Sequence, residues 1–127
     1  MHVRAKKHLG QHFLKEDSVS QRITESLTGH GGYKHLVEVG PGIGALTKHL
    51  IGRANTHLVC YEVDTESVEH LQRQFPDLDV RESDFLRMDP DSITSGPIAV
   101  IGNFPYNIST EIVFTVLEHR DRFPELV

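Results

Sequence analysis

The stretch His35-Leu36-Val37-Glu38-Val39-Gly40-Pro41-Gly42-Ile43-Gly44-Ala45 decides the fold class. Its apolar first half predicts a buried strand over 35–39, which the glycines then break. Gly40, Gly42 and Ala45 fit the spacing G-x-G-x-x-G/A, in which a strand turns into a helix and the backbone approaches a bound ligand. Glycine suits this turn because a side chain would hold the ligand away from the backbone. Alone, the loop fits NAD, FAD and S-adenosylmethionine equally, and it also fits a turn that binds nothing.

Strand and helix patterns alternate on both sides of this loop. Further short apolar runs predict strands over 57–61, 78–81 and 98–101. Helical spacing predicts four helices: one begun by Asp17 and Ser18, one over 45–50, one capped by Asp64 and one begun by Ser109 and Thr110. This alternation is typical of an α/β fold with a parallel sheet. Right-handed crossovers then predict a Rossmann-like strand order 3-2-1-4, with a ligand crevice at the carboxyl ends of the first and fourth strands.

The composition is that of one globular domain. The chain has 127 residues, of which 38% are hydrophobic and 24% are charged. Its one cysteine, Cys60, cannot form a disulfide within the chain, which indicates a reducing compartment. No apolar run approaches the ~20 residues of a membrane span, and the N-terminus lacks the apolar core of a signal peptide. We therefore expect a cytoplasmic protein with no membrane partner.

The charge is unevenly distributed. The formal net charge is −5, yet residues 1–15 carry Arg4, Lys6, Lys7 and Lys15 and no acidic side chain. A short basic arm on an acidic body is compatible with phosphate binding, so Arg4, Lys6 and Lys7 are candidate RNA-binding residues. The alternative is a solvated tail with no partner.

Two acidic residues follow the next strands. Glu62 lies 18 residues after Gly44, close to the ~20 residues at which an acid binds a ribose in such folds. A carboxylate accepts two hydroxyl hydrogen bonds, which suits a ribose diol. Asp84 follows the third strand and can accept a hydrogen bond from an adenine amine. Because the glycine loop, Glu62 and Asp84 end three successive strands, we expect one shared site.

The segment Asn103-Phe104-Pro105-Tyr106 ends the fourth strand, across the expected crevice. An exocyclic adenine amine is a poor nucleophile because its lone pair is delocalised into the ring. The side-chain carbonyl of Asn103 and the backbone carbonyl at Pro105 can hold such an amine in line with a methyl donor, and Tyr106 can stack on the flipped base. The segment therefore predicts an adenine-N6 methyltransferase with Asn103, Pro105 and Tyr106 as catalytic residues. The alternative is a loop without a catalytic role, in which proline ends a strand.

Several motifs together resemble the small-subunit ribosomal RNA adenine dimethyltransferases. They are Lys7-His8-Leu9-Gly10-Gln11-His12-Phe13-Leu14, Glu38 to Gly42, Glu62, Ser83-Asp84 and Asn103-Phe104-Pro105-Tyr106-Asn107-Ile108-Ser109-Thr110. The resemblance implies a class I methyltransferase fold, S-adenosylmethionine as cofactor with S-adenosylhomocysteine as product, and dimethylation of two adjacent adenosines near the 3′ end of 16S ribosomal RNA. It implies small-subunit rRNA or the pre-30S particle as partner.

The resemblance also implies site residues. Cofactor contacts are expected from His12, Leu14, Gly40, Gly42, Glu62, Asp84 and Asn103. The family usually carries Asn where this chain has His12, whose imidazole can still donate or accept a hydrogen bond. His8 and His12 are four residues apart but lack a third ligand, so no metal is expected.

Family members continue well beyond Val127, with further strands and a helical C-terminal domain. We therefore interpret residues 1–127 as the N-terminal portion of a catalytic domain, with a basic arm over 1–15 and a βαβ core over 16–127. Later strands and the C-terminal domain are expected to be missing. The strand over 98–101 would then have an unpaired edge, which predicts self-association through that edge or a loosened loop after it.

Three alternatives stay open. The macrolide-resistance methyltransferases of large-subunit rRNA share the Asn-x-Pro-Tyr element but usually lack the Gly-Pro-Gly form of the loop. A dinucleotide-binding oxidoreductase fragment explains the glycine loop and Glu62 and leaves Asn103 to Tyr106 unexplained. In a third, non-enzymatic interpretation, a chain of this length is catalytically silent.

Overall fold

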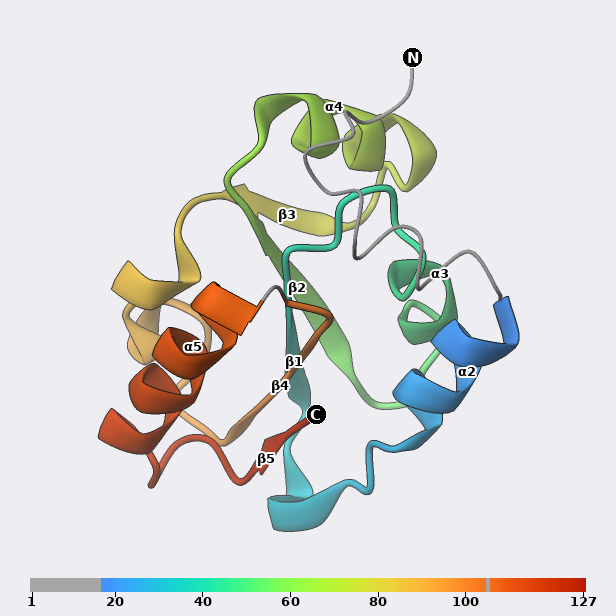
Figure 1. Cartoon of the computed structure of the whole chain (residues 1–127). Helices are drawn as coiled ribbons and strands as arrows, with labels where there is room; N and C mark the ends of the chain where they lie inside the picture. The colour runs from blue at the N-terminus through green and yellow to red at the C-terminus, as the bar shows by residue number, and fades with distance from the viewer. Residues whose placement is uncertain (1–16, 105) are drawn as a thin grey trace.

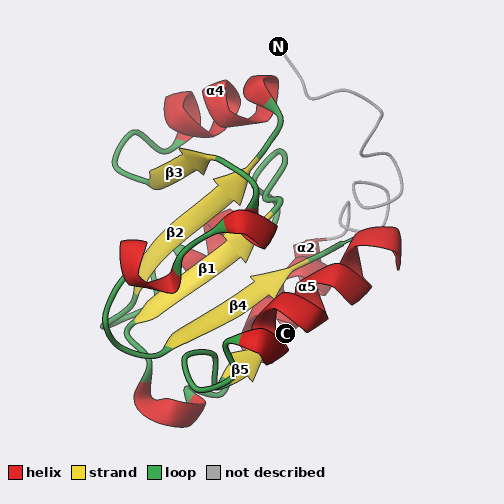
Figure 2. Cartoon of the chain, turned by 90° about the vertical axis from the view of Figure 1, so that its left-hand side faces the viewer, coloured by secondary structure: helices red, strands yellow, loops and turns green. Residues whose placement is uncertain are grey.

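The computed structural model describes residues 17–104 and 106–127, and the side chains of residues 105–107 lie outside that description. Five parallel strands form one sheet in the order β3-β2-β1-β4-β5 (Figure 2). The strands are β1 His35–Val39, β2 His57–Glu62, β3 Asp79–Glu82, β4 Ile98–Gly102 and β5 Glu125–Leu126. The predicted α/β fold and the order 3-2-1-4 are confirmed, and each of the four predicted strands is present.

Helices and short 3₁₀ turns connect the strands. They are α2 Asp17–Glu25, η2 His30–Gly32, α3 Thr47–Leu50, α4 Thr65–Gln74, η3 Phe85–Arg87, η4 Pro90–Ser92 and α5 Tyr106–Glu118. Asp64 caps α4 as predicted, since its side chain accepts a hydrogen bond from the Ser67 amide. The start of α5 was predicted at Ser109, one turn too late. Capping preferences locate a helix end only to within about a turn.

Asp17 has a different role from the predicted helix cap. It lies in the first turn of α2, and its carboxylate contacts Lys48 Nζ at 2.7 Å and His49 Nε2 at 2.9 Å. These hydrogen bonds lower the pKa of Asp17. Asp17 therefore ties α2 to α3, a pairing between segments that a local capping pattern does not reveal.

The sheet is covered on both faces, and successive strand residues alternate between them. Leu36, Leu58 and Ala99 belong to one buried cluster, on the side of α2 and α3. Val37 and Val100 belong to a second cluster, on the side of α5. Figure 1 shows α5 on one side of the sheet and α2 with α3 on the other. The central strands are therefore buried on both faces, which explains their nearly continuous apolar sequence.

The edge of β4 was predicted to be unpaired, and this prediction is wrong. β5 lies parallel to β4, with Glu125 beside Ala99 and Leu126 beside Val100. The sequence pattern missed β5 because two residues are too short for a recognisable alternation. Because β5 covers that edge, the self-association predicted through β4 no longer has support from a free edge.

The side chain of Glu125 fastens β5 to the segment between α2 and β1. Its carboxylate accepts hydrogen bonds from Thr28 Oγ1 at 2.6 Å, the Thr28 amide at 3.0 Å and Tyr33 Oη at 2.7 Å. These bonds lower the pKa of Glu125 against the opposing effect of burial. A contact between residues so distant in the sequence explains why β5 holds its place despite its length.

Within residues 17–104 and 106–127, no helix has the length and apolar character needed to span a bilayer.

Candidate functional site

The glycine loop between β1 and α3 has the backbone that its sequence predicts. Gly40, Gly42 and Gly44 all have positive φ, at 67°, 57° and 90°, a region that other residues rarely adopt. The Gly40 amide donates to the Tyr61 carbonyl at 2.8 Å, which fixes the loop to β2. A Cβ on Gly40 would meet no heavy atom of the described residues within 4 Å, whereas one on Gly44 would lie 3.1 Å from Phe75. The loop therefore leaves open space at Gly40 and packs tightly at Gly44.

Glu62, at the end of β2, holds this loop in place. Its side chain is only 2% exposed. One carboxylate oxygen accepts from the Gly42 amide at 3.0 Å, and the other accepts from the Asp64 amide at 3.0 Å. The predicted ligand residue is thus also a structural support of the glycine loop, a role that sequence spacing did not reveal.

Glu38 is a buried acid beneath the loop to which the sequence pattern assigned no role. It is 1% exposed, and its carboxylate accepts from Thr47 Oγ1 at 2.6 Å and from Cys60 Sγ at 3.8 Å. Burial raises the pKa of Glu38 to about 7, and the neighbouring Glu62 adds to the rise. Burial also raises the pKa of Cys60, whose thiol therefore stays protonated. The sequence offers one sign of this buried acid, because Glu38 is an acidic residue within an otherwise apolar predicted strand.

Asp84 follows β3 and lies beside the end of β2. The Ser83 amide donates to the Glu62 carbonyl at 3.2 Å, which aligns the two strand ends. Asp84 Oδ1 accepts from the Leu86 amide at 3.0 Å and so caps η3. The sequence therefore located Asp84 correctly, and the structure adds that part of its hydrogen-bonding capacity is already used.

Asn103 lies across β1 from Glu62, directly after β4. The register pairs Val39 with Gly102, so Gly40 and Asn103 are the next residues of two adjacent parallel strands. Asn103 is partly buried and already engaged in an interaction. The glycine loop, Glu62, Asp84 and Asn103 thus share one edge of the sheet, as the strand order predicted.

The remaining predicted residues lie outside the described part of the chain. They are Arg4, Lys6, Lys7, His12, Leu14 and Pro105, together with the side chain of Tyr106. Among the described residues, no three His, Cys, Asp or Glu side chains are grouped so that they could hold a metal ion. His8 and His12 belong to the undescribed segment.

Gly102 sets the path of the chain into Asn103. A Cβ on Gly102 would lie 2.7 Å from the Val39 carbonyl oxygen and closer still to the Phe104 ring. The Val39 backbone lies within a sheet strand and cannot move away without a cost in free energy. Gly102→Ala is therefore expected to lower the free energy of unfolding by about 1–3 kcal/mol, as measured by urea denaturation. Gly52→Ala is the matched control, since a Cβ there meets nothing within 4 Å of the described residues. Equal losses in the two variants would contradict the close approach at Gly102.

Known proteins match the chain over nearly its whole length. The family model for ribosomal RNA adenine dimethylase matches residues 2–125. The ribosomal RNA small subunit methyltransferase A of Cytophaga hutchinsonii is 49% identical over 98% of this chain and 49% of its own length. The protein of the same name from Flavobacterium johnsoniae is 47% identical over 97% of this chain and 48% of its own length. The chain thus spans about half the length of these relatives.

Solved structures share the fold. The 23S rRNA methyltransferase ErmE has a TM-score of 0.74 and 31% identity over 87% of this chain and 44% of its own. A dimethyladenosine transferase from Plasmodium falciparum has a TM-score of 0.68 and 22% identity over 88% of this chain and 40% of its own. The observed sheet is accordingly that of the class I methyltransferases.

Proposed function

The chain belongs to the ribosomal RNA adenine dimethylase family, and from this premise we propose that it is the N-terminal, cofactor-binding portion of an enzyme that methylates N6 of adenosine in RNA. The proposed cofactor is S-adenosylmethionine, and the proposed substrate is small-subunit ribosomal RNA or the pre-30S particle in the cytoplasm. Relatives named for the small subunit are up to 49% identical, against 31% for the large-subunit enzyme ErmE, and this difference favours the small-subunit substrate.

One observation carries the proposal: the glycine loop and two strand-end carboxylates share a sheet edge with Asn103. The open space at Gly40 suits a ligand that approaches the backbone closely. Glu62 would accept hydrogen bonds from the ribose hydroxyls, and Asp84 would accept one from the adenine amine of the cofactor, since carboxylates are hydrogen-bond acceptors. His12, Leu14 and Gly42 would complete the cofactor contacts.

The reaction needs little from the protein beyond orientation. The cofactor supplies an activated methyl group. Asn103 and the backbone carbonyl at Pro105 would accept hydrogen bonds from the target amine and hold its nitrogen in line, while Tyr106 would stack on the flipped base. No general base is required, because the methylated ammonium loses its proton readily. Arg4, Lys6 and Lys7 would contact RNA phosphates.

The test is a pair of binding titrations followed by a transfer assay. Calorimetry should show S-adenosylhomocysteine binding in the roughly 1 µM–1 mM range typical of enzyme ligands, with no comparable heat for NADH. Labelled methyl groups should then appear in unmodified small-subunit rRNA and not in 23S rRNA. Binding of NADH without S-adenosylhomocysteine would overturn the cofactor assignment. Transfer to 23S rRNA alone would replace the substrate with that of the macrolide-resistance type.

A further inference from the structure

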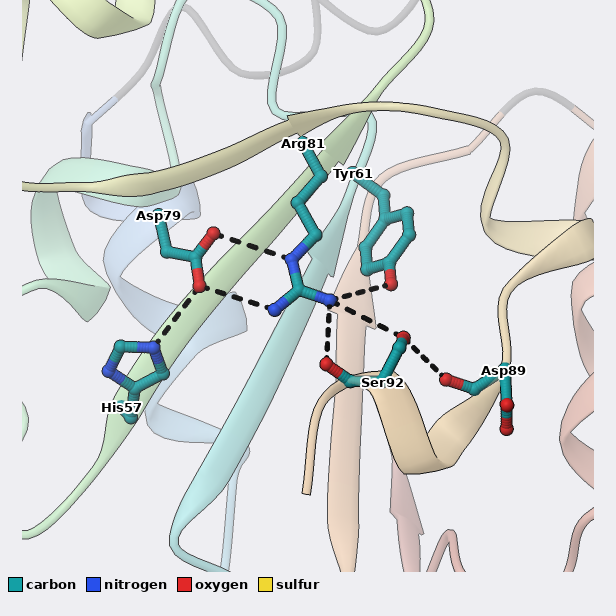
Figure 3. Close-up of polar contacts among 6 residues, drawn as sticks. All are labelled: His57, Tyr61, Asp79, Arg81, Asp89 and Ser92. Atoms are coloured by element: carbon teal, nitrogen blue, oxygen red, sulfur yellow. Dashed lines mark hydrogen bonds and ion pairs between the residues drawn. The ribbon is translucent and has the colours of Figure 1, made fainter.

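The connection from β3 to β4, residues 83–97, is held by an arginine on β3. Arg81 Nη1 donates to the Ser92 carbonyl at 3.2 Å and to Tyr61 Oη at 3.3 Å (Figure 3). The guanidinium lies 5.8 Å from the centroid of the Tyr61 ring. Asp79 contacts its other side through Nε and Nη2, each at 3.4 Å. Arg81 therefore joins the sheet to η4 through one planar group.

A second arginine holds the same connection from the other end of the chain. Arg122, just before β5, donates through Nε to the Gly96 carbonyl at 3.1 Å and through Nη2 to the Thr94 carbonyl. Its Nη1 contacts the Asp91 carboxylate at 2.6 Å. The backbone carbonyls of residues 92, 94 and 96 thus all accept from guanidinium groups, which satisfies polar groups that the sheet does not pair.

The near end of the connection carries Asp84. Phe85 is 2% exposed, and its ring packs edge-on against the rings of Tyr61 and Phe123. The distances between ring centroids are 5.8 Å and 6.1 Å. Tyr61 is the residue that Arg81 contacts, and Phe123 directly follows Arg122. Phe85 is therefore held by Tyr61, which Arg81 contacts, and by Phe123, which follows Arg122 in the chain. Asp84 lies in the sequence between Phe85 and the end of β3.

We propose that Arg81 and Arg122 are positioning residues for recognition of the cofactor's adenine ring. They pin the connection over residues 83–97 and thereby hold the Asp84 carboxylate where it can accept from the adenine 6-amino group. Their side chains are 29% and 24% exposed, so both groups are partly removed from water and their hydrogen bonds are screened less than those of a surface pair. The inference rests on the proposed function and adds two residues that position Asp84 for recognition of the cofactor's adenine ring.

The experiment compares S-adenosylhomocysteine with S-inosylhomocysteine, which has an oxo group in place of the 6-amino group. One charge-assisted hydrogen bond should give the wild-type chain about a 10–100-fold preference for the adenine ligand. In Arg81→Met and Arg122→Met, the preference should fall to within about threefold. Arg73→Met is the control, because Arg73 is exposed on α4, and it should keep the wild-type preference. Arg81→Lys should recover only part of it, since lysine lacks the planar fork.

The ratio of the two affinities separates positioning from general destabilisation. A purely structural role would weaken both ligands alike and leave their ratio unchanged, and that result would overturn the inference. If Arg122→Met does not fold, Asp91→Asn removes its 2.6 Å ion pair at an exposed position and should lower the preference more mildly. No binding of S-adenosylhomocysteine to the wild-type chain would instead reject the proposed function. Wild-type binding without preference would reject the role of Asp84, and the inference with it.

Discussion

Replacement of Asn103 by alanine is expected to lower the rate of methyl transfer about 10²–10³-fold, with a loss of cofactor affinity of about tenfold or less. The larger effect falls on the rate because the Asn103 carbonyl is proposed to hold the target amine in line, and a misplacement of about 1 Å costs on the order of 10²-fold. Asn103 directly follows Gly102, which pairs with Val39 of β1, so the sheet fixes the chain up to the residue before Asn103. Single-turnover transfer of labelled methyl groups to small-subunit rRNA measures the rate, and calorimetry with S-adenosylhomocysteine measures the affinity.

Two further variants sharpen the Asn103 prediction. Asn103→Asp keeps an acceptor oxygen, so its rate should lie between those of the wild type and Asn103→Ala. Gln72→Ala removes an amide of similar chemistry from the exposed face of α4 and should leave both quantities unchanged. If Asn103→Ala kept more than about a third of the wild-type rate, the amine would have to be oriented by other groups.

The strands and the shared edge were predictable because each depends on a pattern that local sequence carries. Buried parallel strands read as apolar runs, and glycines with positive φ mark the loop at Gly40 to Gly44. The strand order then brings Glu62, Asp84 and Asn103 to one edge, whatever their side chains contact. This part of the site follows from topology alone.

The contacts that were missed join residues far apart in the sequence. β5 depends on hydrogen bonds that Thr28 and Tyr33 donate to the Glu125 carboxylate, and no local sequence pattern predicts them. The connection over residues 83–97 was predicted as a loop, yet its carbonyls are held by Arg81 and Arg122, which local sequence shows only as charged residues. Side-chain partners of this kind are set by tertiary packing, which local periodicity does not encode.

Glu38 is expected to make the stability of the chain depend strongly on pH. Its pKa rises from 4.5 to about 7 on folding, chiefly through burial. Between these values the folded chain holds a proton that the unfolded chain has lost. The contribution of Glu38 is therefore fully present below about pH 4.5 and is lost as the pH rises through about 7. The difference in pKa corresponds to about 3 kcal/mol in the free energy of unfolding.

Glu38→Gln isolates this effect. The amide is close in shape to the protonated carboxyl and can still accept from Thr47 Oγ1, but it does not ionise. Urea denaturation from pH 4.5 to 8.5 should show equal stabilities at the acid end, and the variant should become more stable by up to about 3 kcal/mol at pH 8. Glu69→Gln removes the same charge from an exposed position on α4 and should follow the wild-type profile. Subtracting the profiles cancels the opposite trend from Glu125, whose pKa is lowered by folding. A constant difference between wild type and Glu38→Gln across this range would show that the pKa of Glu38 is the same in the folded and unfolded chains, which would contradict the expected rise.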